Sequence, residues 1–200
     1  LIKGTSEFGK ELDSLTDFVS FGIAPVFILY FWELNNYGKL GWAIALIYSV
    51  CCVLRLARFN LTKNENDQDW KNNFFEGVPS PAGGVLVLMP LVFSFSELQF
   101  IKINYNLVVP SIFIIISILL ISKIPTYSLK KIVVPRSMTI FLLFTVVLYF
   151  GLLLIYNFNT ILISGLAYLL FIPVSTTHYY KINKKFMTQF DDNDDHEDIL

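Results

Sequence analysis

The stretch MTIFLLFTVVLYFGLLLIY, residues 138–156, contains no charged side chain. A second uncharged stretch, LVVPSIFIIISILLI, occupies residues 107–121. Both are continuous apolar blocks that lack the polar face of an amphipathic helix on a soluble protein. A helix needs about 20 mostly apolar residues to cross the hydrocarbon core of a bilayer. The two stretches therefore predict helices that lie within a membrane.

The composition of the whole chain agrees with this prediction. Hydrophobic residues make up 54% of the 200 residues, charged residues make up 16%, and phenylalanine alone occurs 19 times. The mean hydropathy is +0.59. A soluble domain of this length has too little interior to bury so many apolar blocks. The chain is therefore predicted to be an all-α, polytopic integral membrane protein.

Six transmembrane helices are expected from the positions of the apolar blocks. They cover residues 12–32, 40–57, 82–100, 107–122, 138–156 and 160–177. Of the 15 lysines and arginines, all except Lys39 and Lys102 fall before the first span, in or after the last turn of the second, or after the fourth or sixth. Because loops rich in lysine and arginine remain in the cytoplasm, that side of the protein is expected to be cytoplasmic.

Residues 1–178 are expected to form one membrane domain, followed by a cytoplasmic tail over residues 179–200. The tail is basic and then acidic, and because charged runs are usually solvated we expect it to be disordered. The chain has no basic patch with interleaved aromatic residues, so nucleic acid is not an expected partner. Cys51 and Cys52 are adjacent in an apolar block and point about 100° apart on a helix, so no disulfide is expected between them.

Acidic side chains occur where the first membrane span begins. Gly9, Asp13 and Asp17 are four residues apart, so they lie along one stripe of an α-helix. Asp17 is followed at once by apolar residues, and an ionised carboxylate at that depth costs on the order of a few kcal/mol unless it faces a cavity, a cation or a partner. A divalent cation would remove this cost and the repulsion from Asp13. The alternative, acids favoured by the dipole of a helix start, explains Asp17 less well because it lies about two turns into the helix.

Two arginines stand at the end of the second span. Arg55 and Arg58 are three residues apart and share a helix face, and Asn60 follows them. Their side chains could anchor the span at the cytoplasmic surface, or a guanidinium could bind a carboxylate through two parallel hydrogen bonds. The nearby turn Pro79-Ser80-Pro81 could start the third span or shape a pocket beside the arginines.

The pattern Gly9-x-x-x-Asp13-x-x-x-Asp17 resembles the second half of the CDP-alcohol phosphatidyltransferase signature. The full signature reads D-x-x-D-G-x-x-A-R, then eight residues, then G-x-x-x-D-x-x-x-D. Its first half would end directly before Leu1. The resemblance therefore implies two further spans upstream of Leu1, and an eight-helix layout for the complete protein.

Three further stretches resemble the bacterial phosphatidylserine synthase branch of that family. They are DFVSFGIAP at residues 17–25, RLARFN at residues 55–60 and FFEGVPSPA at residues 74–82. The phosphatidylglycerophosphate synthase pattern L-D-P-x-A-D-K is not present, because Ser14 and Phe18 stand in place of its proline and lysine. Past residue 82 only the hydropathy pattern agrees with the branch.

The resemblance implies transfer of the phosphatidyl group from CDP-diacylglycerol to L-serine, which releases CMP at the cytoplasmic face of a bacterial inner (plasma) membrane. It implies a divalent cation, Mg²⁺ or Mn²⁺, at Asp13 and Asp17, with Asp17 also acting as general base. Ser6, alternatively the N-cap of the helix, and Gly9 would contact CDP-diacylglycerol. The residues that would bind serine are Arg55, Arg58, Asn60 and Ser80.

Two alternatives remain from the sequence. The acceptor could be another alcohol used in the same family: glycerol 3-phosphate, choline or inositol. More distantly, an intramembrane pair of carboxylates could belong to a small transporter, although transporters usually have helices broken at the bilayer midplane and the last three expected spans are uninterrupted apolar runs. Those spans would serve as a scaffold, as a surface for membrane lipids or as the interface of a homodimer.

Overall fold

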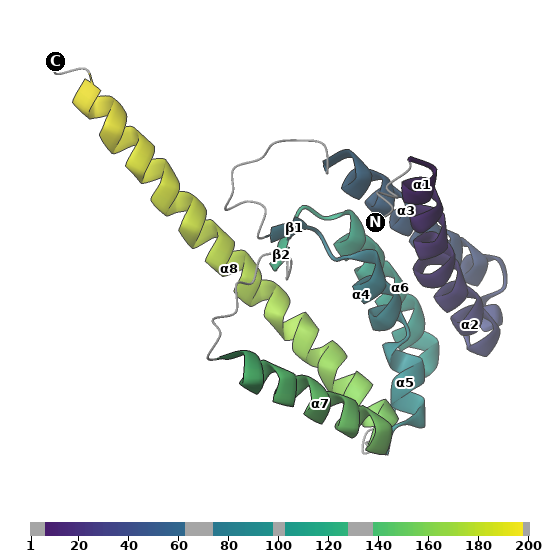
Figure 1. The fold of residues 1–200 in the computed structure, drawn as a ribbon. Helices are drawn as coiled ribbons and strands as arrows, with labels where there is room; N and C mark the ends of the chain where they lie inside the picture. The colour runs from purple at the N-terminus through teal and green to yellow at the C-terminus, as the bar shows by residue number, and fades with distance from the viewer. Residues whose placement is uncertain (1–6, 63–73, 98–102, 128–137, 198–200) are drawn as a thin grey trace.

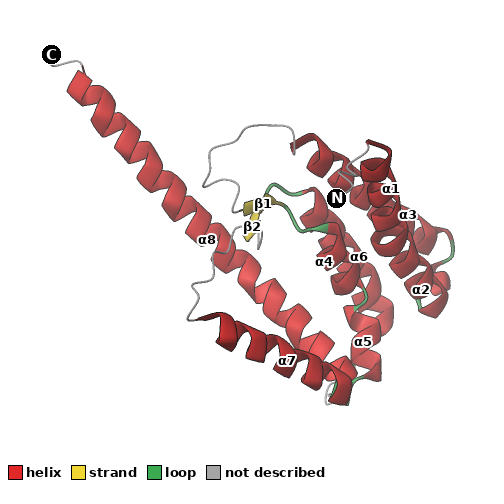
Figure 2. Ribbon diagram, in the orientation of Figure 1, coloured by secondary structure: helices red, strands yellow, loops and turns green. Residues whose placement is uncertain are grey.

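The computed structural model describes residues 7–62, 74–97, 103–127 and 138–197 (Figure 1). Helices dominate this part of the chain (Figure 2). In chain order they are α1 (Glu7–Asp17), the π-helix η1 (Phe18–Ile23), α2 (Ala24–Trp32), the 3₁₀-helix η2 (Leu34–Tyr37), α3 (Lys39–Thr62), α4 (Ser80–Val87), α5 (Met89–Phe95), α6 (Tyr105–Ile121), α7 (Thr139–Ile155) and α8 (Asn157–Glu197).

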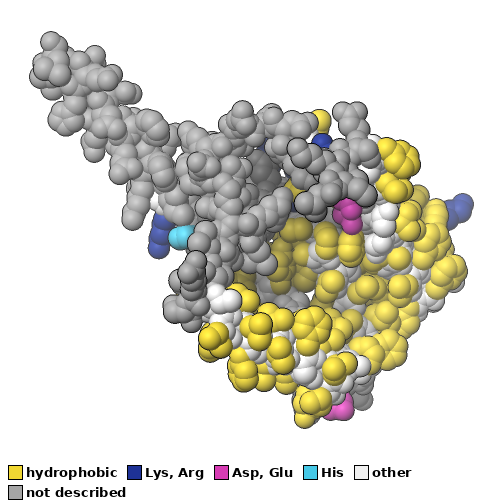
Figure 3. Space-filling view, viewed as in Figure 1, with side chains coloured by type: hydrophobic (Ala, Val, Ile, Leu, Met, Phe, Trp, Pro, Cys, Tyr) yellow, Lys and Arg dark blue, Asp and Glu magenta, His cyan; other side chains and the backbone are white. Residues whose placement is uncertain are grey.

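Within the described ranges, three helical stretches are long and apolar enough to cross a membrane, and two shorter apolar helices accompany them. The long stretches are Phe8–Trp32, Lys39–Leu61 and Asn157–Lys181, and the shorter helices are Tyr105–Ile121 and Thr139–Ile155. Apolar side chains cover much of the described surface in Figure 3, and no residue of α7 is buried. Such a surface fits a lipid environment, as the hydropathy predicted.

The first span is one helix whose hydrogen-bonding pattern changes at η1. The N–H of Ala24 donates to the carbonyl of Val19, five residues earlier. Pro25 has no N–H to offer the carbonyl of Phe21, and the hydroxyl of Tyr48 on α3 donates to that carbonyl instead, at 3.0 Å. Ser49 likewise donates to Gly22, at 3.1 Å. Two side chains of α3 therefore satisfy backbone groups of η1 and fix the helices against each other.

The single span expected over residues 82–100 is two short helices in the structure. α4 ends at Val87 and α5 begins at Met89. Pro90 explains the break, because its ring would clash with the carbonyl of Leu86 in a continuous helix and it lacks an N–H. The same proline is well suited to the first turn of α5, where the structure places it.

A small antiparallel sheet, which the all-α prediction did not include, joins two distant loops. β1 (Phe74–Glu76) pairs with β2 (Pro125–Tyr127), with Phe75 opposite Thr126. Gly77 follows β1 with φ of +74°, and a Cβ at this position would lie 2.6 Å from the carbonyl oxygen of Ser122. The sheet therefore needs glycine here, and it holds the chain before α4 against the end of α6.

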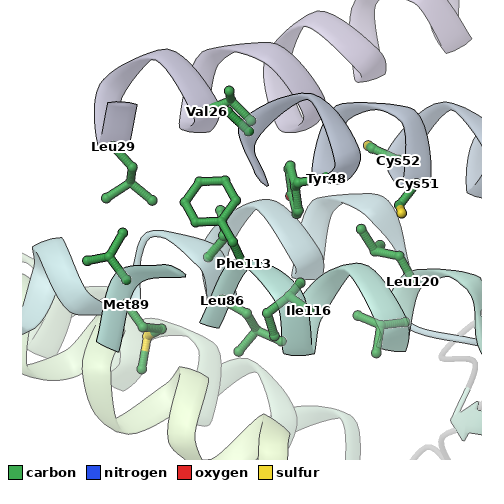
Figure 4. Close-up of a cluster of buried hydrophobic side chains, with 14 of the residues drawn as sticks. Val26, Leu29, Tyr48, Cys51, Cys52, Leu86, Met89, Phe113, Ile116 and Leu120 are labelled. Carbon is green, nitrogen blue, oxygen red and sulfur yellow. The ribbon is translucent and has the colours of Figure 1, made fainter. Parts of the chain in front are cut away.

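The hydrophobic core lies between α3, α4 and α6, with α2 at one side (Figure 4). Tyr48 of α3 and Phe113 of α6 are fully buried, and their rings meet edge to face with centroids 5.4 Å apart. Cys51 and Cys52 are buried in the same core as free thiols, as the sequence predicted. This core fixes the end of α3, where the arginines lie.

The chain after the last expected span continues as helix. α8 runs from Asn157 to Glu197 and so includes most of residues 179–200, which the sequence analysis assigned to a cytoplasmic tail. Once a helix has formed, each added residue gains a backbone hydrogen bond without a new nucleation cost, so α8 can extend past the apolar segment that anchors it.

Replacement of Tyr48 by phenylalanine should destabilise the protein without changing its core volume. The carbonyl of Phe21 would lose its donor inside the protein, which costs about 1–2 kcal/mol. Thermal or denaturant unfolding in detergent micelles measures the change, with Tyr149→Phe on the exposed face of α7 as the matched control. Equal stability of the two variants would contradict the role given to the Tyr48 hydroxyl.

Candidate active site

The carboxylate stripe expected at the start of the first span lies on one helix. Gly9, Asp13 and Asp17 all belong to α1, and Asp17 is its last residue before η1. Asp13 is exposed and Asp17 is half-buried. The two carboxylates are close enough to repel each other electrostatically. Ser6 lies outside the described residues.

Arg55 is the buried arginine at the end of α3. Its side chain is 5% exposed, and its Nε donates to the carbonyl oxygen of Val78 at 3.2 Å. The guanidinium also lies over the ring of Phe59, 5.7 Å from the ring centre. Since a charged group is rarely buried without a reason, Arg55 is a stronger candidate for ligand binding than for anchoring to the membrane surface.

Cys52 lies on α3 one turn before Arg55. Its buried thiol is within electrostatic range of Asp17 and Arg55, and the hydroxyl of Ser80 lies next to it. Gly22 of η1 packs closely against this thiol, because a Cβ there would be 3.2 Å from the sulfur. The sequence analysis treated Cys52 only as a core residue, but its position three residues before Arg55 would have placed it on the same helix face.

Ser80 is buried, at 3% exposed, and begins α4 between two prolines, with Pro79 as the N-cap. The Pro79-Ser80-Pro81 turn thus starts a helix, which was one of its two predicted roles. Among the described residues the Ser80 hydroxyl has no hydrogen-bond partner. Buried polar groups in proteins are nearly always paired, so a ligand is a natural partner for this one.

Arg58 and Asn60 form hydrogen bonds with other helices of the protein. Nη1 of Arg58 donates to the carbonyl oxygen of Ile121 at 2.8 Å, at the end of α6, where a cation also complements the helix dipole. Nδ2 of Asn60 donates to the hydroxyl of Ser14 at 2.8 Å, and Ser14 directly follows Asp13 on α1. These contacts tie α3 to α6 on one side and to the carboxylate helix on the other.

The donor atoms of α1 suit a hard divalent cation. Mg²⁺ and related cations prefer carboxylate oxygens, and Asp13 and Asp17 provide them from one stripe. Across the described ranges no group of three or more histidine, cysteine or acidic side chains is gathered. The two aspartates would therefore need further oxygen ligands, such as those of a phosphate-containing substrate, to complete the coordination of the ion.

Comparison with known proteins agrees with this chemistry. The CDP-alcohol phosphatidyltransferase family model matches residues 1–122, which is more than half of the chain and includes every residue of the candidate site. The chain belongs to the CDP-alcohol phosphatidyltransferase family. Together with its apolar helices, this membership makes it an integral membrane protein.

Several similar proteins bear the name CDP-diacylglycerol–serine O-phosphatidyltransferase. The one from Helicobacter pylori is 34% identical over 132 residues, 66% of this chain and 54% of that protein. The one from Mycobacterium bovis is 36% identical over 141 residues, covering 68% of this chain and 48% of its own length. The one from Methanocaldococcus jannaschii is 38% identical over 128 residues, with 62% and 53% covered. The chain spans about half the length of these relatives.

The hydrogen bond between Asn60 and Ser14 should be visible as an energetic coupling. Asn60→Ala and Ser14→Ala should each lower the free energy of unfolding by about 1 kcal/mol, and the double variant should lose little more than either single variant. Unfolding of the four proteins in detergent micelles gives the coupling energy. Fully additive losses would show that the bond does not hold α1 to α3.

Proposed function

We propose that the protein transfers the phosphatidyl group of CDP-diacylglycerol to L-serine and releases CMP. The carboxylate stripe of α1 and the buried Arg55, which is bound to the chain two residues before buried Ser80, carry the proposal, because the reaction needs a base, a carboxylate-binding cation and polar groups. The names of the relatives at 34–38% identity support serine as the acceptor.

Asp13 and Asp17 would hold Mg²⁺ or Mn²⁺ beside the diphosphate of the donor. A bound cation of this kind neutralises charge on the phosphate oxygens and stabilises the leaving CMP. Gly9, one turn before Asp13 on the exposed side of α1, would let the cytidine phosphates approach the helix closely. We assign a nucleotide contact to Ser6 as well, on the resemblance alone.

Asp17 would act as the general base. It accepts the proton of the serine hydroxyl, the serine oxygen attacks the phosphorus that carries the diacylglycerol, and the bond from that phosphorus to the oxygen of CMP breaks. Because Asp17 is half-buried at the end of α1, water competes less with the serine hydroxyl there than at exposed Asp13.

Arg55 and Ser80 would hold the acceptor. A guanidinium binds a carboxylate strongly through two parallel hydrogen bonds, and serine brings a carboxylate. Of the two predicted arginines, Arg55 is buried and bound to the carbonyl of Val78, two residues before Ser80, so we assign it the direct contact. Arg58 and Asn60, whose hydrogen bonds reach Ile121 and Ser14, would support the acceptor site by positioning α6 and α1.

The distribution of charge supports a cytoplasmic active site. The basic residues gather in the segments on one side of the expected spans, and Asp17, Arg55 and Ser80 stand at the ends of spans that border those segments. We therefore propose six spans in this chain, with the site open to cytoplasmic serine. Expression of reporter fusions after residues 62 and 104 would place the two loops on opposite sides.

The full-length protein should form phosphatidylserine from CDP-diacylglycerol and L-serine. Membranes from cells that express it, supplied with radiolabelled CDP-diacylglycerol and Mg²⁺ or Mn²⁺, should release CMP only when serine is added. Glycerol 3-phosphate, choline and inositol serve as the comparison acceptors. Turnover with one of these and not with serine would contradict the proposed acceptor while leaving the family chemistry intact.

Replacement of Asp17 by asparagine should lower kcat by about 10²–10⁴-fold, because it removes the base and a metal ligand together. Asp13→Asn should abolish measurable turnover. EDTA should abolish the turnover of the wild type, and added Mg²⁺ or Mn²⁺ should restore it. Glu11→Gln, on the same helix but off the stripe, is the matched control and should remain active. Wild-type turnover by Asp17→Asn would show that the stripe is structural.

A further inference from the structure

The π-helix η1 connects a helix that is fixed in the core to one that is not. After η1, the side chains of Val26 and Leu29 anchor α2 in the core (Figure 4). Before η1, none of residues 8–17 of α1 is buried, and only Ser14 and Asp17 among them are half-buried. Because no buried side chain fixes these residues, the rotation of α1 about its own axis depends on η1.

The face of α1 that lies toward α3 contains the residue assigned as the base. Ser14 and Asp17 are three residues apart, so they share a helix face. The hydroxyl of Ser14 accepts a hydrogen bond from Nδ2 of Asn60 on α3, at 2.8 Å. The rotation of α1 seen in the structure therefore places Asp17 on the side of the helix that meets α3.

The π form of η1 determines this rotation. A π turn contains about one residue more than an α turn, because its hydrogen bonds join residues five apart instead of four, as the N–H of Ala24 does with the carbonyl of Val19. If η1 became α-helical at the same chain length, α1 would turn by about 100° and shift by about 1.5 Å relative to α2. Leu15 would then occupy the place of Ser14, and Phe18 the place of Asp17.

Two neighbouring side chains of α3 support the π form. The hydroxyl of Tyr48 donates to the carbonyl of Phe21 at 3.0 Å, and that of Ser49 donates to the carbonyl of Gly22 at 3.1 Å. Donors from another helix compensate for the backbone hydrogen bonds that an irregular turn loses. We propose that Tyr48 and Ser49 are positioning residues, which hold η1 in its π form and thereby direct the carboxylates of α1 toward α3. The catalytic part of this proposal rests on the proposed function.

Disulfide cross-linking of the full-length protein in membranes tests the direction of α1 without an activity assay. Ser14→Cys with Asn60→Cys should cross-link readily, because the native side chains are 2.8 Å apart, whereas Leu15→Cys with Asn60→Cys should cross-link poorly. Adding Tyr48→Phe and Ser49→Ala should change the ratio of the two yields by about tenfold or more in favour of position 15, the effect of losing two hydrogen bonds. Ser49→Ala alone, which leaves the core tyrosine in place, should give a smaller change in the same direction.

The control pair is Tyr149→Phe with Ser111→Ala. Tyr149 is exposed on α7, and the Ser111 hydroxyl donates to Leu107 of its own helix, so these changes should leave both yields as they are. Single-cysteine variants show whether the buried native thiols contribute. An unchanged ratio in the Tyr48→Phe, Ser49→Ala protein would overturn the proposal, and so would equal loss of both cross-links, which is the result of general unfolding.

Steady-state kinetics connect the direction of α1 to catalysis. Tyr48→Phe with Ser49→Ala should lower kcat for phosphatidylserine formation about tenfold or more, in parallel with the 14–60 cross-link, while the KM for serine changes less because Arg55 does not move. A shifted cross-link with unchanged kcat would overturn the positioning role. If the wild type makes no phosphatidylserine, the proposed function fails, and the cross-linking result still decides whether the two hydroxyls set the rotation of α1.

Discussion

The burial of the Arg55 guanidinium is the constraint on which the arrangement of the site depends. A buried cation without polar partners costs on the order of several kcal/mol, and the carbonyl of Val78 and the ring of Phe59 provide two partners. Val78 reaches Arg55 because Gly77, at positive φ, turns the chain from β1 toward α4. The small sheet thus brings a backbone carbonyl to the buried charge at the end of α3.

α3 also fixes the position of the carboxylates, through its contacts with η1. Tyr48 and Ser49 bind the carbonyls of η1, and Gly22 lets η1 approach Cys52. Because η1 follows Asp17 directly, these contacts determine how far the end of α1 stands from Arg55. π-helical segments are frequent at functional sites, and here the segment lies next to the residue that we assign as the base.

The sequence predicted those parts of the structure that depend on local periodicity. The long spans and the shared stripe of Asp13 and Asp17 follow from apolar run length and from the helical repeat. η1 could not be predicted in this way, because its carbonyl partners lie 27 residues away in the chain. The strands are three residues long, too short for an alternating pattern, and only their distant pairing defines them.

Arg55 and Asp17 suit the two ends of the proposed acceptor. If the carboxylate of serine lies at Arg55, its hydroxyl, two bonds from the carbon that carries the carboxylate, would have to reach Asp17. Because Arg55 is buried, the low dielectric of the protein strengthens its interaction with a carboxylate. An alcohol without a carboxylate would forgo the hydrogen bonds to Arg55 in the complex. Discrimination between acceptors would then come from missing polar interactions, which reject incomplete ligands more strongly than shape does.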